Sequence, residues 1–238
     1  ALAWGVLLAG LVQLAFQLPF LARLGLLPRP RLGFQHPGVR RIGRVMGPAL
    51  FGVSVAQLAL LIDTLLASFL ATGSISWLYY SDRLVEFPLG ILGAALGIVI
   101  LPRLSRCGRL GRQSGVGAEF SRTLDWALRW VLLLGVPASL GLMVLAGPVL
   151  ATLFLSASFG AGDIAMARQS LVAYAAGLAG FMVVKALVPG YYGRQDMRTP
   201  VRIALVAMAV NLALSLALML PFGHGGLAAA TSAAALLN

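Results

Sequence analysis

The sequence predicts an all-α fold, a polytopic bundle of transmembrane helices with about seven spans. Of the 238 residues, 60% are hydrophobic and only 11% are charged, whereas a soluble domain usually carries about 25% charged residues. Apolar stretches of about 18 or more residues recur, and each is long enough to cross a hydrocarbon core roughly 30 Å thick. The links between these stretches alternate between arginine-rich and free of basic residues.

The apolar spans follow one another along the whole chain. They are expected at about 2–21, 46–70, 77–101, 126–155, 164–188 and 201–220, and a seventh begins near 224. Pro137 and Pro148 are expected to break the fourth span, and a tight turn at 221–223 separates the sixth from the seventh. Because the chain begins and stops inside apolar runs, we expect it to be a fragment of a longer transporter-like protein.

The distribution of arginine sets the expected orientation. Three links, at 22–45, 102–125 and 191–202, hold most of the 18 Lys and Arg residues, and the links between them hold none. Basic links remain in the cytoplasm under the positive-inside rule, so the first span enters the cytoplasm at its C-terminal end. The same distribution accounts for the net charge of +11, and we therefore expect no nucleic-acid partner.

Arg83 and Glu86 are charged residues near the outer end of the third span. Ionisable groups at membrane depth cost about 2.5 to 3.5 kcal/mol each on insertion scales, which makes them informative. The two residues are three apart and can pair across one helical turn. They are open to two interpretations: a helix-end ion pair with a snorkelling arginine, or an arginine that faces a water-filled cavity and binds an anion through parallel hydrogen bonds.

Asp63 lies deep in the second span, with no basic partner in its own helix. A carboxylate there needs a cation, a proton or a partner from another helix. Asn211 and Ser215 share a face of the sixth span because they are four residues apart, and Thr231 lies on the seventh. These groups form either interhelical hydrogen bonds or a site for a hard cation. A site requires the Asp63, Asn211 and Thr231 oxygens to lie within about 5 Å of one another.

The sequence carries no pattern that supports enzymatic chemistry. It has no Ser/His/Asp set, no paired cysteines and no nucleotide-binding loop. Cys107 is the one cysteine, so no internal disulfide forms, and His224 alone makes no metal site. We therefore expect no enzyme and no cofactor other than the candidate cation at Asp63.

Segments spread over nearly the whole chain resemble the MurJ (MviN) family of lipid II flippases. They are 17–20, 46–49, 67–70, 73–80, 82–88, 101–105, 189–196 and 199–201. The resemblance implies a fourteen-helix, two-lobed transporter of the MOP exporter superfamily, with this chain as its sixth to the start of its twelfth helix. Residues 1–21 would end a first-lobe helix, 22–45 would be a basic cytoplasmic link, and 46–238 would be a truncated second-lobe bundle.

The same resemblance implies a substrate and a direction. Lipid II, an undecaprenyl pyrophosphate-linked disaccharide-pentapeptide, would pass from the cytoplasmic to the periplasmic leaflet of the bacterial inner membrane by alternating access. Membrane potential or a cation gradient would drive the step. Arg83 and Glu86 would bind the substrate, and membrane lipids would be the other partners.

The resemblance also implies a role for the polar residues of the second, sixth and seventh spans. Asp63, Asn211 and Thr231 match a sodium site described in some family members, and Ser215 stands where a second carboxylate is expected. Two alternatives remain. One is a MOP-type exporter of another lipid-linked oligosaccharide or a drug, which an acidic cavity would favour. The other is a membrane scaffold, in which Arg83 and Asp63 would be buried in packed interfaces.

Overall fold

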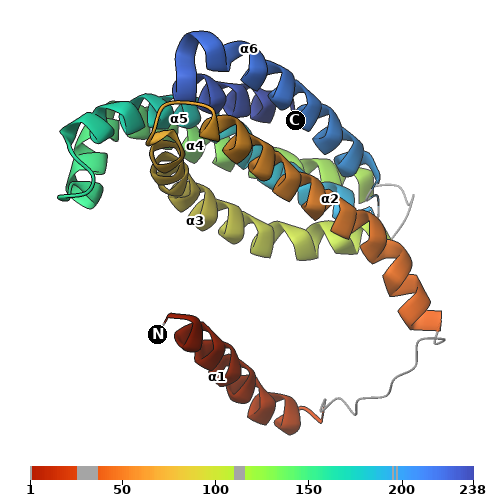
Figure 1. Ribbon diagram of the computed structural model, residues 1–238. Coiled ribbons are helices and arrows are strands. Elements are labelled where there is room, and N and C mark those ends of the chain that lie inside the picture. Colours follow the sequence, from red (N-terminus) through yellow and green to blue (C-terminus); the bar gives the residue numbers. More distant parts are fainter. Residues whose placement is uncertain (1, 26–36, 110–115, 195, 197) are drawn as a thin grey trace. The chain divides into compact units, whose positions relative to one another are not determined.

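The computed structural model describes residues 2–25, 37–109, 116–194, 196 and 198–238. The secondary structure of this part of the chain is helical, which confirms the predicted all-α class (Figure 1). In chain order the helices are α1 Leu2–Arg23, α2 Pro37–Ser68, α3 Ser74–Arg109, α4 Val116–Phe154, α5 Ala161–Gly193 and α6 Arg198–Leu237. The chain divides into two compact units, Ala1–Arg44 and Val45–Asn238, and α2 crosses the boundary between them. Whether these units correspond to two lobes of a larger protein stays a prediction.

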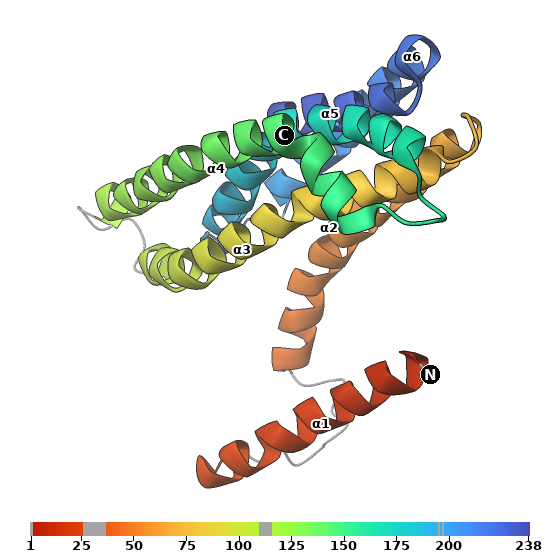
Figure 2. The same cartoon turned by 90° about the vertical axis from the view of Figure 1, so that its left-hand side faces the viewer.

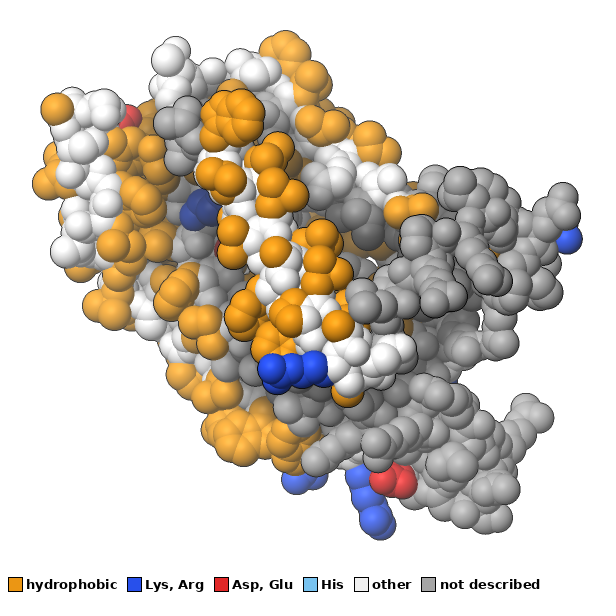
Figure 3. Space-filling view, turned by 90° about the horizontal axis from the view of Figure 1, so that it is seen from below, with side chains coloured by type: hydrophobic (Ala, Val, Ile, Leu, Met, Phe, Trp, Pro, Cys, Tyr) orange, Lys and Arg blue, Asp and Glu red, His pale blue; other side chains and the backbone are white. Residues whose placement is uncertain are grey.

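Four of the described helices, α1, α4, α5 and α6, are long and apolar enough to cross a membrane. Large apolar side chains point outward from them, as Val144 at 75% and Leu153 at 63% exposure do on α4. Described side chains on the face drawn in Figure 3 are mostly hydrophobic. Lipid offers the backbone no hydrogen-bond partner, so helices satisfy their own. The chain is a multi-pass membrane protein, and the count of seven spans stays a prediction.

Several helices are longer than the predicted spans. α2 begins at Pro37, so residues 37–44 of the predicted basic link are helical; proline is well tolerated in a first helical turn. α4 continues through Pro137 and Pro148, so the predicted break in the fourth span was wrong. A break there would expose backbone groups to lipid, and a membrane helix accommodates proline instead.

α6 reverses direction at Gly223, where the backbone has φ 55° and ψ −134°. A side chain at such a positive φ is strained, and glycine avoids that cost. The turn predicted at 221–223 is therefore present. The expected sixth and seventh spans are the two arms of this one bent helix, which folds back on itself in Figure 1.

The core of the second unit is centred on α5, which contacts α3, α4 and α6 (Figure 2). Leu171, Leu178 and Met182 are buried on one face of α5, at spacings that bring them onto the same side of the helix. Gly177 lets the second arm of α6 approach closely, since a Cβ there would lie 2.6 Å from Ser232 Cα. Small residues commonly permit such contacts between membrane helices.

Polar contacts join the ends of α3, α5 and the second arm of α6 beside the links that lack basic residues. The Trp77 indole N–H donates to Asp163 Oδ1 at 2.9 Å. The His224 ring lies edge-on to Trp77, with centroids 4.9 Å apart. The Ser170 hydroxyl is 2.7 Å from His224 Nδ1. These contacts hold together three of the helices that frame the pocket described next.

Candidate functional site

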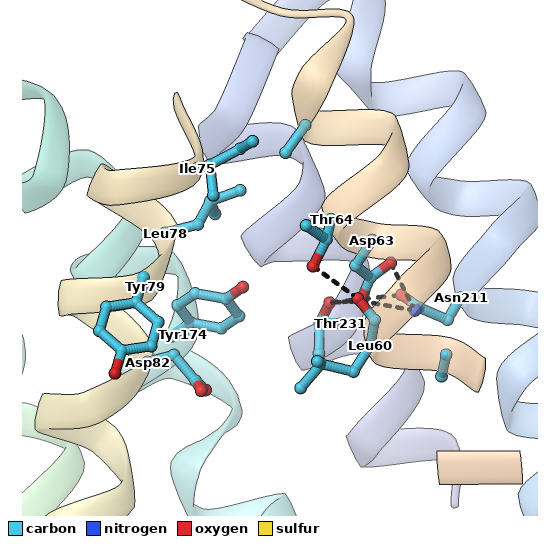
Figure 4. A pocket seen from close by; sticks show the side chains of 12 residues that line it. Leu60, Asp63, Thr64, Ile75, Leu78, Tyr79, Asp82, Tyr174, Asn211 and Thr231 are labelled. Carbon is cyan, nitrogen blue, oxygen red and sulfur yellow. Dashed lines mark hydrogen bonds between the residues drawn. The ribbon is translucent and has the colours of Figure 1, made fainter. Parts of the chain in front are cut away.

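A pocket of about 290 Å³ lies among α2, α3, α5 and α6, within the second unit. Its lining residues are Ala59, Leu60, Asp63, Thr64, Ala67, Ile75, Leu78, Tyr79, Asp82, Tyr174, Asn211 and Thr231. The walls are mainly apolar, and at least one polar side chain comes from each of the four helices (Figure 4). The pocket therefore combines a largely dry surface with a few polar groups that face one another.

Asp63, Asn211 and Thr231 meet on the α2 and α6 side of this pocket (Figure 4). The Asn211 amide nitrogen donates to both Asp63 carboxylate oxygens, at 3.2 and 3.3 Å. The Thr231 hydroxyl lies 3.4 Å from Asp63 Oδ2 and 3.4 Å from Asn211 Oδ1. The structure thus brings together three residues predicted from the sequence, from α2 and both arms of α6. Their role in binding an ion stays a prediction.

Ser215 lies behind this cluster. It is fully buried, its hydroxyl is 3.5 Å from Asn211 Oδ1, and it does not line the pocket. The contact is at the limit of a hydrogen bond, so Ser215 supports the Asn211 side chain from behind. A serine here supplies no charge, which leaves Asp63 as the one carboxylate of the cluster.

Arg83 and Glu86 form an ion pair on α3, with 2.7 Å between Arg83 Nη1 and Glu86 Oε2. Their side chains are 55% and 53% exposed. The Arg83 guanidinium also lies over the Tyr79 ring, 5.0 Å from its centroid, a distance suited to a cation–π contact. Neither residue lines the pocket. Their exposure disagrees with the scaffold hypothesis, which placed Arg83 in a packed interface.

Sequence reasoning missed several polar residues of the pocket, among them Asp82 and Tyr174. Asp82 is an acid within the apolar third span, but only its neighbours Arg83 and Glu86 were considered from the sequence. The structure pairs Arg83 with Glu86, as the sequence allowed, and places Asp82 on the pocket wall. Tyr174 gives no sequence signal, because a tyrosine in an apolar helix usually packs in the core.

The pocket does not fit a transition-metal centre. In the described ranges no group of three or more His, Cys, Asp or Glu side chains is close enough to hold a metal ion. Its donors are a carboxylate, an amide and hydroxyl oxygens, which are the ligands of hard cations. The fold and this pocket define a class: a polytopic membrane protein with polar groups gathered between helices.

Comparison with known proteins narrows that class to a family. A family model described as "Lipid II flippase MurJ" matches residues 1–238. The chain is 54% identical over 237 residues to a "Probable lipid II flippase MurJ" of Vibrio cholerae, which covers all of this chain and 44% of the relative. It is 41% identical over 242 residues to a "Lipid II flippase MurJ" of Burkholderia cenocepacia, with 46% of that relative covered. The chain belongs to the MurJ family.

Solved structures show the same fold. A MurJ structure in an inward-closed conformation matches with a TM-score of 0.73 at 24% identity, over 92% of this chain and 46% of that one. An outward-facing multidrug resistance transporter of the MATE family, in the MOP superfamily, matches with a TM-score of 0.68 at 20% identity, over 82% and 42%. The chain spans about half the length of the curated relatives it matches.

Proposed function

We propose that this chain is part of a lipid II flippase of the bacterial inner membrane, which moves its substrate from the cytoplasmic to the periplasmic leaflet by alternating access. The family match over all 238 residues carries the proposal. Relatives at 54% and 51% identity are named as probable lipid II flippases. Such a protein moves a lipid across the bilayer and makes or breaks no covalent bond.

Arg83 is the residue of this chain best placed to bind the pyrophosphate. Glu86 and the Tyr79 ring hold its guanidinium on two sides, yet the side chain remains 55% exposed. A guanidinium carries five N–H donors, and the contact with Glu86 Oε2 leaves others free. The ion pair therefore orients an arginine whose remaining donors can form the paired hydrogen bonds that phosphate oxygens accept.

The test is substitution of Arg83 in the full-length protein, with lipid II translocation measured in proteoliposomes. Arg83→Ala is expected to lower the rate at least about 10-fold, because a charge-assisted contact is worth about 1.5 to 3 kcal/mol. Arg83→Lys should recover only part of the rate, since an ammonium cannot form the planar fork. Arg129→Ala on α4 removes an exposed arginine that has no assigned role and serves as the control. A normal rate in Arg83→Ala would refute the role.

We further propose that Asp63, Asn211 and Thr231 bind the coupling cation, with Na⁺ as the candidate. A bound cation would neutralise the Asp63 carboxylate. The Asn211 amide nitrogen now occupies the position facing both Asp63 oxygens, so ion binding requires this amide to turn its oxygen inward. Sodium titration of transport in wild type and Asp63→Asn separates an ion from a structural proton, since identical responses leave only the structural interpretation.

The negative charge of the pocket supports a second candidate function, the export of an organic cation. Its lining includes two acids, Asp63 and Asp82, and no Lys or Arg, and the MATE fold match shows that this architecture also occurs in multidrug transporters. At about 290 Å³, however, the pocket is at the bottom of the range of about 300 to 1,000 Å³ for drug-sized ligands. Efflux of a cationic dye that depends on Asp63 would support this candidate over the first.

A further inference from the structure

The charges of the pocket do not balance within its walls. Asp63 and Asp82 enter it from α2 and α3, and none of its twelve lining residues is Lys, Arg or His. Asp82 has no hydrogen-bond or ion-pair partner among the residues that the structure describes. Its neighbour Arg83 is held by Glu86, 2.7 Å away. A half-buried carboxylate without a partner requires a cationic ligand or a proton.

Tyr174 supplies an independent sign of a ligand. This α5 side chain is only 8% exposed, and its hydroxyl has no hydrogen-bond partner in the part of the chain that the structure describes. The hydroxyl is accessible from the pocket, where a ligand or water can supply the partner that a largely buried phenol usually has. Figure 4 shows the Tyr174 hydroxyl directed into the pocket, on the same side as Asp82 and across from the Asp63 cluster.

The pocket has room for more than the Asp63 cluster alone would bind. Its volume of about 290 Å³ accommodates several water molecules, each of which takes about 30 Å³ in the liquid. The polar atoms of Asp63, Asn211 and Thr231 already contact one another, at 3.2 to 3.4 Å. Asp82 and Tyr174 line the same pocket on the wall across from the Asp63 cluster (Figure 4), so a ligand held there would not need to displace that cluster.

We propose that Asp82 and Tyr174 form a second monovalent-cation site, on the wall of the pocket opposite the Asp63 cluster. The Asp82 carboxylate supplies the charge, the Tyr174 oxygen supplies a neutral ligand, and water in the pocket completes the shell. The proposal adds a second ion to the cation that was proposed above to bind at Asp63. The first ion depends on that proposed function, whereas the second ion depends only on Asp82 and Tyr174.

Two ions in one pocket would couple different helices. The Asp63 cluster joins α2 to both arms of α6, whereas Asp82 and Tyr174 lie on α3 and α5. Arg83 follows Asp82 directly on α3, so the occupancy of the second site acts next to the proposed substrate contact. An ion biases a conformational equilibrium only to the extent that its affinity differs between the two states.

The experiment counts bound ions without using transport. Equilibrium binding of radioactive Na⁺ to the purified full-length protein is measured at constant ionic strength with choline as the replacement cation. We expect two Na⁺ sites within this half of the protein, and therefore a loss of one Na⁺ per protein in Asp82→Asn and of another in Asp63→Asn. Tyr174→Phe, which removes one neutral oxygen, should weaken the second ion about tenfold. Asp125→Asn and Tyr192→Phe make the same chemical changes outside the pocket and should bind like wild type.

The outcomes separate the two proposals. If Asp82→Asn binds as many Na⁺ ions as wild type, the second site does not exist, whatever happens at Asp63. If Asp82→Asn loses one ion but Asp63→Asn loses none, the second site stands and the cation role of the Asp63 cluster fails. Either result is independent of lipid II translocation, which tests Arg83. Thermal unfolding of each variant without Na⁺ confirms that a lost ion does not reflect a misfolded protein.

Discussion

Asn211 is the residue that connects every other member of the polar cluster. Its amide nitrogen contacts both oxygens of Asp63, and its carbonyl oxygen faces the hydroxyls of Thr231 and Ser215. Interhelical hydrogen bonds in membranes contribute only about 0.6 kcal/mol each on average. Such bonds are weak enough to be exchanged for ion coordination, which makes a cluster of this kind suitable for a site that fills and empties.

Thr231 offers a direct test at the scale of one oxygen atom. Its hydroxyl carries a single proton and lies near three acceptors, Asp63 Oδ2, Asn211 Oδ1 and the Leu227 carbonyl. Thr231→Val keeps the shape but removes the oxygen, and we expect Na⁺ affinity to fall about tenfold. Thr231→Ser keeps the oxygen and should stay within about threefold of wild type. Equal affinities for valine and serine in Na⁺ titrations would exclude Thr231 as a ligand.

Asp196 caps the start of α6 outside the membrane-spanning segment. Its carboxylate accepts the Thr199 hydroxyl at 2.6 Å and the amides of Arg198 and Thr199 at 3.1 and 3.2 Å. The Thr199 hydroxyl, followed by the backbone amides, holds the pKa of Asp196 below its ordinary value.

A carboxyl group whose folded-state pKa is lowered stabilises the fold above its unfolded-state pKa, near about 3.9, and ceases to do so as pH falls through the folded-state value. Asp196→Ala should therefore lower the Tm at neutral pH, and the difference from wild type should shrink below about pH 4. A Tm difference that is the same at about pH 7 and about pH 3 would show that the charge is not what stabilises the cap.

Some polar residues of the pocket can be recognised as site residues from the sequence, and others cannot. Asp63 and Asn211 stand out because each is a lone polar group within an apolar span, and their partnership follows from the cost of leaving them unpaired. Asp82 was missed because the spacing of the sequence does not show that its side chain points into a pocket while that of the adjacent Arg83 does not. Tyr174 was missed because only packing decides whether a phenol hydroxyl faces a core or a pocket.

α5 is the element on which the second unit depends. It contacts α3, α4 and α6, and its glycines set how closely α6 approaches. The Ser232 hydroxyl of α6 donates to the Ala173 carbonyl of α5 at 2.7 Å, and the buried Ser139 hydroxyl of α4 donates to the Ala175 carbonyl. Close approach and side chain-to-backbone hydrogen bonds therefore hold the same stretch of α5 from two sides.

A methyl group at Gly177 tests this packing. A Cβ there would lie 2.6 Å from both Cα and Cβ of Ser232, so α5 and α6 would have to separate. Gly177→Ala should destabilise the full-length protein by about 1 to 3 kcal/mol, as overpacking does. Gly141→Ala on α4 meets no atom within 4 Å and should remain within about 1 kcal/mol of wild type. Thermal unfolding in detergent measures both, and equal midpoints would show that the contact is loose.

Helix boundaries were predicted less well than helix identities. Hydropathy locates the apolar middle of a span, but α2 and α3 extend through arginines into the basic links, since a helix outside the lipid needs no apolar residues. Proline in α4 also misled the prediction, because the rule that proline ends a helix is weaker inside a bilayer. The turn in α6 was predicted correctly because its proline and glycine coincide with a change in hydropathy.

At the scale of the whole molecule, the pattern of basic links orders the helices relative to the two sides of the membrane. Arg23 ends α1, Arg109 ends α3 and Arg198 begins α6. The links that lack basic residues, after α2 and after α4, are expected on the other side. The positive-inside rule predicts that the arginine-bearing ends are cytoplasmic, and the Trp77–Asp163 and Ser170–His224 contacts would then lie toward the periplasm.

Accessibility of single cysteines tests this orientation in cells. The background is the full-length protein with Cys107 replaced by Ser and any other native cysteines removed. Thr72→Cys and Ser158→Cys should react with a membrane-impermeant maleimide added from outside, because both positions are exposed in links without basic residues. Ser121→Cys and Arg198→Cys, also exposed but in basic segments, should react only after the membrane is opened.

The choice of positions matters because a distorted link would change the labelling for reasons unrelated to orientation. Gly73 is unsuitable, since its φ of 105° and a Cβ position 2.7 Å from the Trp77 ring would strain the turn between α2 and α3. Its neighbour at position 72 is exposed and accepts a cysteine without that strain. Labelling of Ser121→Cys but not Ser158→Cys in intact cells would reverse the orientation and place the Trp77 contacts in the cytoplasm.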